Sequence, residues 1–430
     1  MAAKTARECA LAAVERCRRD GAWSEAALDG ILTSAGLDGR DCALATAICS
    51  SVLQNTALCD FYISKFCTTR PEKLEPKILD ILRMAVCQIV FMDKIPAHAA
   101  VSEAVSMAKR HNRRAAPLVN AVLRRISENR ASLPEVPGRG TPEYLATRYS
   151  HPLWLCRTLC DERGYSFAEA FLAADNAPPP TVAQTNTLRI TPHELYEKWR
   201  AEGIDAVSDV LPGSFRIRAR GGLRRLGSFR EGLFYIQDCA ARLAVEKASP
   251  GPGMRVLDAC SAPGGKSFAA AMAMGGAGSI LACDIHEKKL KRIAEGAERL
   301  GISSMISTRA MDARQPDPSL TGEFDLTIAD VPCSGIGVIR KKPDIRFKSE
   351  QELERLPGIQ LDIVRALAQT VRPGGRLLYS TCTVLRRENE GVAEAFLAER
   401  PEFECEHMQT LFPNTDGTDG FFICVMRKKS

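Results

Sequence analysis

The sequence predicts a multidomain protein with an all-α N-terminal domain, a small α+β module and a C-terminal α/β domain of Rossmann-like architecture. Two patterns indicate this order. Apolar residues recur at helical spacing early in the chain, as at Ile78, Ile81, Leu82 and Ala85. From about residue 237, strand-like apolar runs alternate with amphipathic helical segments. A chain of 430 residues is long enough for two or three such domains.

The helical domain is expected over residues 1–133, as a bundle of five to seven helices with prolines at helix boundaries. Residues 134–142 read Pro-Glu-Val-Pro-Gly-Arg-Gly-Thr-Pro and indicate a linker. A small module over residues 143–236 should follow. Its strands are expected at 181–190, 214–220 and 233–236.

The C-terminal domain, residues 237–430, should carry a parallel, doubly wound sheet. Helices are expected between its strands, at 267–274, 287–300, 351–371 and 388–399. The strands are expected at 254–258, 279–284, 305–308, 324–330, 375–380 and 421–426.

Composition excludes several classes of protein. The apolar fraction of 45% and charged fraction of 26% are those of a globular protein, not of a disordered one. We expect neither a signal peptide nor a membrane-spanning segment, and therefore a cytoplasmic protein. The 16 cysteines include no Cys-x-x-Cys pair and histidine is scarce, so no metal site is expected. The net charge of +6 permits a nucleic-acid partner.

Three basic runs favour a phosphate backbone as that partner. They cover residues 109–114, 216–230 and 340–348, and the second holds six arginines and no acid. Any single run could instead be a solvated face of the protein.

An acidic residue ends each of the first strands of the C-terminal domain: Asp258, Asp284, Asp330, and Asp312 near the end of the third strand. In doubly wound sheets ligands bind at the carboxyl ends of the strands. Four acids there suit a ligand with hydroxyls and a positive charge, so S-adenosylmethionine fits best. A dinucleotide fold without its fingerprint is the alternative.

The loop after the first strand has two glycines that allow a tight turn and close approach of a ligand. It lacks the spacing of a G-x-G-x-x-G motif or a Walker loop. Its candidate cofactor residues are Cys260, Ser261, Ala262, Pro263, Gly264, Gly265 and Lys266.

Two cysteines, Cys333 and Cys382, follow strand ends at the same rim. Thiols there suit methylation of a pyrimidine at C5, since a thiolate that adds to C6 makes C5 nucleophilic. Asp330 is placed to protonate N3 of cytosine, which would require a desolvated site that favours its protonated form.

These motifs resemble those of the bacterial 16S rRNA cytosine-C5 methyltransferases of the Sun/Fmu type, over essentially the whole chain. Residues 257–266 are similar to the cofactor loop of that family. Asp330-Val-Pro-Cys-Ser-Gly, with Pro343-Asp344 downstream, and Tyr379-Ser-Thr-Cys-Thr resemble its catalytic motifs, and residues 387–390 and 419–422 also fit. The resemblance implies that Cys382 is the nucleophile, that Cys333 assists release of the product, and that Lys266 is functional.

The N-terminal segment resembles the NusB domain, chiefly at residues 95–105 and 118–125, which implies RNA binding. Asn120 and Arg124 could contact RNA there, or could serve capping or interdomain packing. The chain departs from the family pattern at Val331 (usually Ala), Thr383 (usually Ser) and Gln184 (often Arg). The last departure weakens the expectation that this strand contacts phosphate.

The expected function is S-adenosylmethionine-dependent methylation of cytosine C5 in 16S rRNA through a covalent Cys–C6 adduct. The expected enzyme is a cytoplasmic monomer that acts on free or early-assembly rRNA without a metal or a membrane. One alternative is the same chemistry on tRNA or another rRNA site. The other is a NusB-like RNA-binding or antitermination factor with an inactive catalytic domain, which the presence of both cysteines and all four acids opposes.

Overall fold

The computed structural model describes residues 5–20, 24–218 and 222–430. The chain forms two compact units. Unit 1 comprises Met1–Ala177 together with Ile339–Glu350, and unit 2 comprises Pro178–Val338 together with Gln351–Ser430. The chain thus leaves unit 2 after Val338, contributes a short segment to unit 1, and returns. The domain limits expected at residues 133, 142 and 236 stay predictions.

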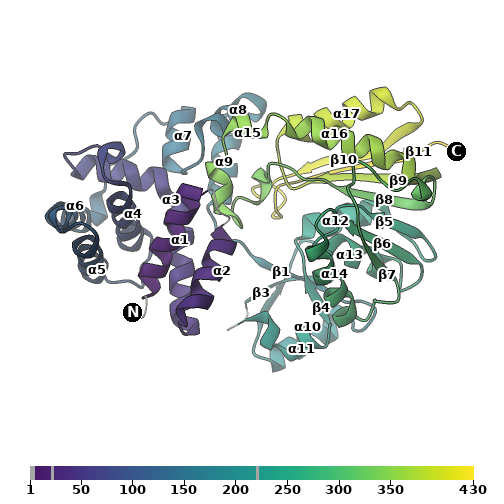
Figure 1. The fold of residues 1–430 in the computed structure, drawn as a ribbon, viewed down its shortest axis with the longest axis horizontal. Coiled ribbons are helices and arrows are strands. Elements are labelled where there is room, and N and C mark those ends of the chain that lie inside the picture. The colour runs from purple at the N-terminus through teal and green to yellow at the C-terminus, as the bar shows by residue number, and fades with distance from the viewer. Residues whose placement is uncertain (1–4, 21–23, 219–221) are drawn as a thin grey trace. The chain divides into compact units, whose positions relative to one another are not determined.

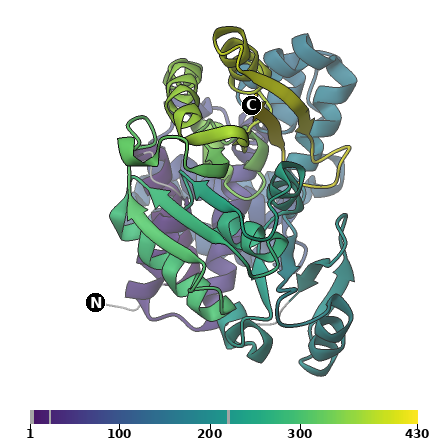
Figure 2. The same cartoon turned by 90° about the vertical axis from the view of Figure 1, so that its right-hand side faces the viewer.

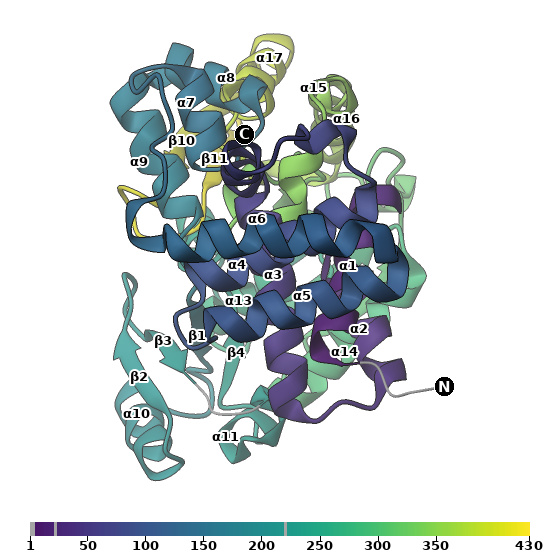
Figure 3. The ribbon, with the colours of Figure 1, turned by 90° about the vertical axis from the view of Figure 1, so that its left-hand side faces the viewer.

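Unit 1 is helical (Figure 3). Within residues 1–133, the described residues form six α-helices, as the periodicity predicts. Further on come α7 (Pro142–Arg148), α8 (Leu153–Arg163), α9 (Tyr165–Asp175) and the 3₁₀ turn η7 (Pro343–Phe347), with smaller turns η1 (Pro71–Lys73), η2 (Arg113–Ala115) and η3 (Arg130–Ser132). The six helices are α1 (Ala6–Asp20), α2 (Ser24–Ala35), α3 (Gly39–Phe66), α4 (Pro76–Phe91), α5 (Ala97–His111) and α6 (Ala116–Glu128).

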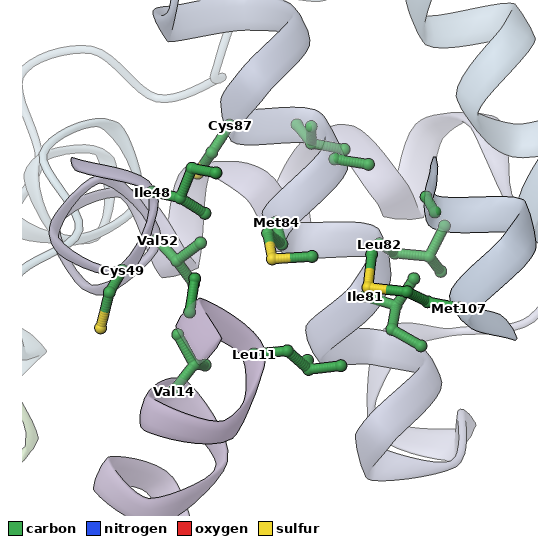
Figure 4. Close-up of a cluster of buried hydrophobic side chains, with 14 of the residues drawn as sticks. Leu11, Val14, Ile48, Cys49, Val52, Ile81, Leu82, Met84, Cys87 and Met107 are labelled. Atoms are coloured by element: carbon green, nitrogen blue, oxygen red, sulfur yellow. The ribbon is translucent and has the colours of Figure 1, made fainter. Parts of the chain in front are cut away.

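Helix α4 is the centre of the bundle, because most of its positions are buried on all sides. Figure 4 shows side chains of α1, α3, α4 and α5 meeting around Ile81 and Met84. Full burial of each such aliphatic side chain stabilises the fold by about 1.5–3 kcal/mol. The one buried acid of α4, Asp80, is paired with Arg18 at 2.9 Å and Arg83 at 3.1 Å.

Helix α3 is the one described helix long and apolar enough to cross a membrane by length and composition. Core helices of water-soluble bundles meet the same criteria. Eight of its residues, including Ile48 and Val52, are buried within the bundle, and its backbone is kinked at Asn55, where φ is −123°.

The first part of unit 2 is a four-stranded antiparallel sheet of order β2-β3-β1-β4. Trp199 fills its core, with its ring edge-on to Phe215 and Phe234. The sequence did not predict β2, and residues 219–221 of the expected strand 214–220 lie outside the described residues. The elements are β1 (Thr181–Thr185), α10 (Pro192–Ala201), β2 (Asp205–Ser208), β3 (Ser214–Arg218), η4 (Leu223–Arg225), α11 (Gly227–Arg230) and β4 (Phe234–Ile236).

The second part of unit 2 is a seven-stranded sheet of order β10-β11-β9-β8-β5-β6-β7 with helices on both faces (Figures 1 and 2). Its strands are β5 (Arg255–Asp258), β6 (Ser279–Asp284), β7 (Ile306–Ala310), β8 (Phe324–Asp330), β9 (Val371–Thr381), β10 (Phe403–Leu411) and β11 (Phe421–Lys428). The helices and turns are α12 (Cys239–Ala248), α13 (Gly265–Ala273), α14 (Glu287–Leu300), η5 (Pro318–Leu320), η6 (Ile336–Val338), α15 (Glu350–Leu353), α16 (Leu356–Leu367), η8 (Ala368–Thr370), η9 (Arg386–Glu388) and α17 (Glu390–Glu399).

Successive residues of the central strands pack into different cores, because side chains alternate across a sheet. Val256 packs with α12, α13 and α14, whereas its neighbour Leu257 packs with α16 and α17. On β9, Leu378 likewise belongs to the core with α12, α13 and α14, and Leu377 belongs to the core with α16 and α17. This double coverage explains why the strands read as continuous apolar runs.

The expected parallel sheet holds for five strands only. Strand β11 pairs antiparallel with both β9 and β10, so the sheet is mixed. The sequence did not predict β10, because its pattern carries charged residues at an edge, with Glu404 and Glu406 on the strand. The single helix expected at 351–371 is divided into α15, α16 and η8.

Candidate active site

Carboxylates gather where the parallel strands end. Strands β5, β6 and β8 end at Asp258, Asp284 and Asp330, and Asp312 lies two residues beyond β7. A cavity of about 180 Å³ opens at this edge. Asp258 and Asp330 line it together with Gln237, Ser261, Gly265 and Lys266. Two of the four predicted acids, Asp258 and Asp330, therefore line one cavity together with the loop after β5.

The loop after β5 is shaped by its glycines. Gly264 has φ +109°, and a Cβ there would lie 2.5 Å from the ring of Phe268. Helix α13 begins at the next residue, so the loop turns directly into a helix N-terminus. Ser267 on that helix donates to Asp258 Oδ2 at 2.7 Å and shares a hydrogen bond with Ser261. These contacts fix the cavity wall.

Asp258 is fully buried at the base of this wall. Burial raises the pKa of its carboxyl to about 6, against the lowering effect of the Ser267 hydrogen bond and of Lys266. Its Oδ1 is buried and has no hydrogen-bond partner. A buried acceptor of this kind calls for a donor from a ligand. The residues present thus fit a ligand with donor groups or a positive charge.

Asp284, Cys260 and Asp312 lie around this centre with different partners. Asp284 Oδ1 accepts from the backbone N–H of His286 at 2.8 Å. Burial, with the charges of Asp258, Asp330 and Asp284, raises the pKa of the Cys260 thiol, which disfavours a thiolate there. The carboxylate of Asp312 is held by Arg314 at 2.7 Å, which lowers its pKa.

Asp330 is held by two donors. The ammonium of Lys266, which is 8% exposed, lies 2.7 Å from Oδ2. The hydroxyl of Ser380 donates to Oδ1 at 2.9 Å. The sequence does not reveal that Lys266 reaches this carboxyl, and the role expected of Asp330 as a proton donor to N3 stays a prediction.

The two predicted thiols are neighbours. Sγ of Cys333, in the loop after β8, lies 3.3 Å from Sγ of Cys382, in the loop after β9. Both side chains are partly exposed. The hydrogen bond with Cys382, then burial, then the charges of Cys382 and Glu388 raise the pKa of Cys333 well above its usual value. Such a thiol keeps its proton at neutral pH.

A buried polar network holds the two cysteine loops, and most of its members were not predicted to have a role. Glu388 Oε2 accepts from the backbone N–H of Ser334 at 2.8 Å. Ser334 Oγ donates to Thr383 Oγ1 at 2.8 Å, and Asn389 Nδ2 donates to the Thr383 carbonyl at 3.1 Å. Only the resemblance at residues 387–390 pointed to this network.

Two glycines let the loops pack closely. A Cβ on Gly337 would lie 1.9 Å from the carbonyl oxygen of Gly420, and the N–H of Gly420 donates to the Gly337 carbonyl at 2.8 Å. Phe421, next along the chain, places its ring centre 4.9 Å from the Lys266 ammonium. The segment 419–422 therefore supports both the thiol loop and the lysine.

The basic run 340–348 does not offer Arg346 to RNA in this structure. Arg346 is 4% exposed and belongs to unit 1. It donates to the Gln54 carbonyl at 2.8 Å and to Asn176 Oδ1 at 2.6 Å. Neither interpretation of this run, a solvated face or a surface for phosphate, describes Arg346, because an arginine can also satisfy buried acceptors.

The other basic elements differ in exposure. Residues 109–114 are exposed. Arg124, Asn120 and Lys109 line a cavity of about 480 Å³ between α5 and α6. Gln184, in contrast, is 1% exposed; it donates to the Gln237 carbonyl at 2.9 Å and accepts from Arg242 at 2.9 Å. Gln184 thus makes no surface for phosphate, in line with the doubt raised by its sequence.

Three family comparisons cover the chain. Residues 247–427 match the family described as 16S rRNA methyltransferase RsmB/F, and residues 4–128 match the NusB family. Residues 151–221 match a ferredoxin-like domain of RsmF/B-like methyltransferases. The helical start, the small module and the methyltransferase fold predicted from the sequence are confirmed.

Similar proteins extend over nearly the full length. The chain is 36% identical to the probable ribosomal RNA small subunit methyltransferase B of Bacillus subtilis, with 98% of each chain covered. It is 31% identical to ribosomal RNA small subunit methyltransferase B of Vibrio cholerae, covering 91% of this chain and 90% of the other.

Solved structures agree with this relationship. The crystal structure of PH0851 is 25% identical and covers 98% of each chain, with a TM-score of 0.78. A methyltransferase homolog from Pyrococcus horikoshii shares the fold, with 24% identity, a TM-score of 0.59, and coverage of 66% of this chain and 97% of the other. The chain therefore belongs to the RsmB/F family of 16S rRNA methyltransferases, and it is an RNA methyltransferase.

Proposed function

We propose that this enzyme methylates C5 of a cytosine in 16S rRNA through a covalent adduct between Cys382 and C6 of the base. The observation that carries the proposal is the 3.3 Å contact between the Cys333 and Cys382 thiols. Methylation of an exocyclic amine needs no thiol, whereas C5 of cytosine becomes a nucleophile only after a thiolate has added to C6. Two adjoining thiols support this chemistry.

S-adenosylmethionine is the proposed cofactor, and it supplies an electrophilic methyl group on a sulfonium. The residues proposed to hold it are Asp258, Asp284, Asp312, Asp330 and the loop residues Cys260, Ser261, Ala262, Pro263, Gly264, Gly265 and Lys266. The unpartnered Oδ1 of Asp258 and the close backbone at Gly264 support this assignment. The carboxylates complement the positive charge of the cofactor.

The proposed reaction begins when the Cys382 thiolate attacks C6 of the cytosine. The electron pair of the 5,6 double bond moves toward C5, while N3 receives a proton through Asp330 and its neighbour Lys266. With the cofactor bound, C5 would form a bond to its methyl group while the bond from that methyl to the sulfonium sulfur breaks, and the electron pair would stay on that sulfur as a neutral thioether. Loss of the C5 proton to water restores the double bond and expels Cys382 as a thiolate, and the proton on N3 returns to the pair of Asp330 and Lys266. Cys333 assists this last step.

The substrate and setting are proposed on the same basis. The NusB-like domain with its exposed residues 109–114 supports an RNA partner. The target cytosine must leave its stack to reach the thiols, so we propose free or early-assembly 16S rRNA as the substrate. The enzyme would act as a cytoplasmic monomer, without a metal.

The test uses Cys333→Ala and Cys382→Ala with 16S rRNA and S-adenosylmethionine. Only Cys333→Ala should give a denaturant-stable RNA–protein band, because it can form the adduct but releases it poorly. A band for Cys382→Ala alone would reverse the two roles. If wild-type enzyme transfers methyl to tRNA and not to 16S rRNA, the chemistry stands and the substrate is wrong.

A further inference from the structure

Either of the two thiols of the site, Cys333 or Cys382, could in principle become the attacking thiolate. They share a hydrogen bond in which either sulfur can donate, and both are partly exposed at the same rim. A thiolate, not a thiol, attacks carbon. Two adjacent thiolates repel each other, so the first ionisation leaves one thiolate and one thiol. Some feature of the surroundings must decide which sulfur keeps the proton.

A carboxylate is hydrogen-bonded to the loop that carries Cys333. Glu388 is fully buried, and its Oε2 accepts from the N–H of Ser334, the residue after Cys333, at 2.8 Å. The amide of Gln360 donates to the same oxygen at 2.9 Å and to the carbonyl of Pro332 at 3.0 Å. Of the two residues that flank Cys333, Ser334 therefore binds Glu388 directly, and Pro332 is connected to Glu388 through the amide of Gln360.

The loop that carries Cys382 is hydrogen-bonded to an amide. Thr381 and Thr383, which flank Cys382, are bound to the amide of Asn389: Thr381 Oγ1 donates to Oδ1 at 2.6 Å, and Nδ2 donates to the Thr383 carbonyl at 3.1 Å. Two consecutive residues thus bind the two loops: Glu388 binds the Cys333 loop through a carboxylate, and Asn389 binds the Cys382 loop through an amide.

Both hydrogen bonds to Oε2 of Glu388 come from N–H donors. The other oxygen, Oε1, is buried and has no hydrogen-bond partner. In a low-dielectric interior, the charge of a carboxylate acts strongly on a neighbouring ionisable group.

We propose that Glu388 is a positioning residue that keeps the shared proton on Cys333, so that Cys382 carries the thiolate. This inference rests on the proposed function and explains its division of labour. With the proton on Cys333, the S–H donates to the Cys382 thiolate before attack. It donates again to the same sulfur when the C6–S bond breaks and the electron pair returns to sulfur. The rise in the pKa of Cys333 has the sign this requires.

The test is thiol alkylation of the intact enzyme without RNA or cofactor. Iodoacetamide is applied from pH 6 to 9, and the modified cysteines are identified by peptide mass spectrometry. Cys405 is an internal reference, because it is exposed and its hydrogen bond with Cys424 lowers its pKa to about 7. In wild-type enzyme, Cys382 should be modified well before Cys333.

Glu388→Gln keeps the shape of the side chain and removes its charge. We expect the ratio of Cys333 to Cys382 modification to rise on the order of tenfold, the change that one pKa unit produces, and the Cys333 profile to move to lower pH. Glu388→Asp, which keeps the charge, should retain the wild-type preference. Glu390→Gln is the matched control, since the Glu390 carboxylate binds Thr410 at 2.9 Å.

An unchanged ratio in folded Glu388→Gln would overturn the proposal. So would faster modification of Cys333 than of Cys382 in wild-type enzyme, a measurement that needs no variant. The outcome is separate from the adduct gel: a failure of the gel with a normal alkylation preference would remove the C5 chemistry and leave the role of Glu388 in the thiol pair intact.

Discussion

The ammonium of Lys266 lies 2.7 Å from the carboxylate of Asp330, and the pair joins the loop after β5 to the end of β8. The two groups are partly or largely removed from water, so their attraction is stronger than that of an exposed ion pair. The lysine carries N–H protons and lies directly beside the carboxyl that was placed near N3 of the base. This pair is therefore the expected route of the proton to N3 of the base.

Lys266→Met should lower kcat for methyl transfer by about 10²-fold, the lower range for a lost proton donor, with a smaller change in KM for RNA. Lys291→Met is the control, because Lys291 is 81% exposed in a surface pair with Glu295. Single-turnover transfer of labelled methyl from S-adenosylmethionine measures the effect. Equal kcat values for the two variants would show that the Lys266 proton is not used.

The contrast between strand ends and this pair shows what sequence can predict. Asp258 and Asp330 were predicted at the rim because each directly ends an apolar run, and strand ends of a parallel sheet share one edge. The Lys266–Asp330 contact was not predicted, because it depends on strand order: β8 pairs with β5 although β6 and β7 lie between them in sequence.

The burial of Arg346 could not be predicted from the sequence for a different reason. A basic run has the composition of a solvated or RNA-binding surface. Burial of one arginine within it depends on acceptors that are distant in sequence, in α3, after the end of α7 and at the end of α9. The Glu388 network was hidden likewise, since a glutamate between Arg387 and Asn389 gives no local sign of burial.

Asp258 should make stability depend on pH. Burial raises its pKa from 3.8 to about 6. A carboxyl with a raised folded pKa contributes its full stability below the unfolded pKa and loses it as the pH rises through the folded pKa. The free energy of unfolding should therefore fall by up to about 3 kcal/mol between pH 4 and pH 7 from this group.

Asp258→Asn does not titrate in this range, so the stability difference between variant and wild type should shift in favour of the variant as the pH rises from 4 to 7. Urea unfolding at several pH values measures it. A difference that is constant with pH would contradict the raised pKa. The same variant should lose stabilisation by S-adenosylmethionine, because Oδ1 no longer offers a charged acceptor.

Arg124 should contribute to RNA affinity through charge. It is exposed and lines the cavity between α5 and α6 with Lys109 and Asn120. Arg124→Met should weaken binding of 16S rRNA fragments and lower the slope of log K against log salt by about 0.7–0.9, the value for one lost phosphate contact. Arg40→Met, at another exposed position, should leave the slope unchanged. Equal slopes for both variants would remove this cavity from the RNA surface.

Arg346 should be required for the stability of unit 1. Burial lowers the pKa of its guanidinium to about 10, and Asp175 opposes that shift. Arg346→Met would leave the carbonyl of Gln54 and the amide oxygen of Asn176 without this donor. We expect a loss on the order of 3 kcal/mol in the free energy of unfolding. Exposed Arg113→Met should cost less than about 0.5 kcal/mol. Comparable losses in the two would contradict the anchoring role.

Gln184 and Arg242 form a complementary pair, in which the guanidinium donates to the buried amide oxygen at 2.9 Å. Gln184→Arg installs the residue often found in the family, but here it brings a second positive charge against Arg242 in a buried position. We expect the variant to be destabilised, because a buried charge without a partner is costly. In the Gln184→Arg background, Arg242→Gln should recover much of the loss, since it restores one amide and one guanidinium.

The double-mutant cycle therefore should give a coupling of about 1–3 kcal/mol between the two positions, measured by urea unfolding. Arg242 also pairs with Glu246 at 2.7 Å and donates to the Pro212 carbonyl, so Arg242→Gln alone should also destabilise. If the two single losses simply add in the double variant, the pair does not explain why glutamine stands at this strand position.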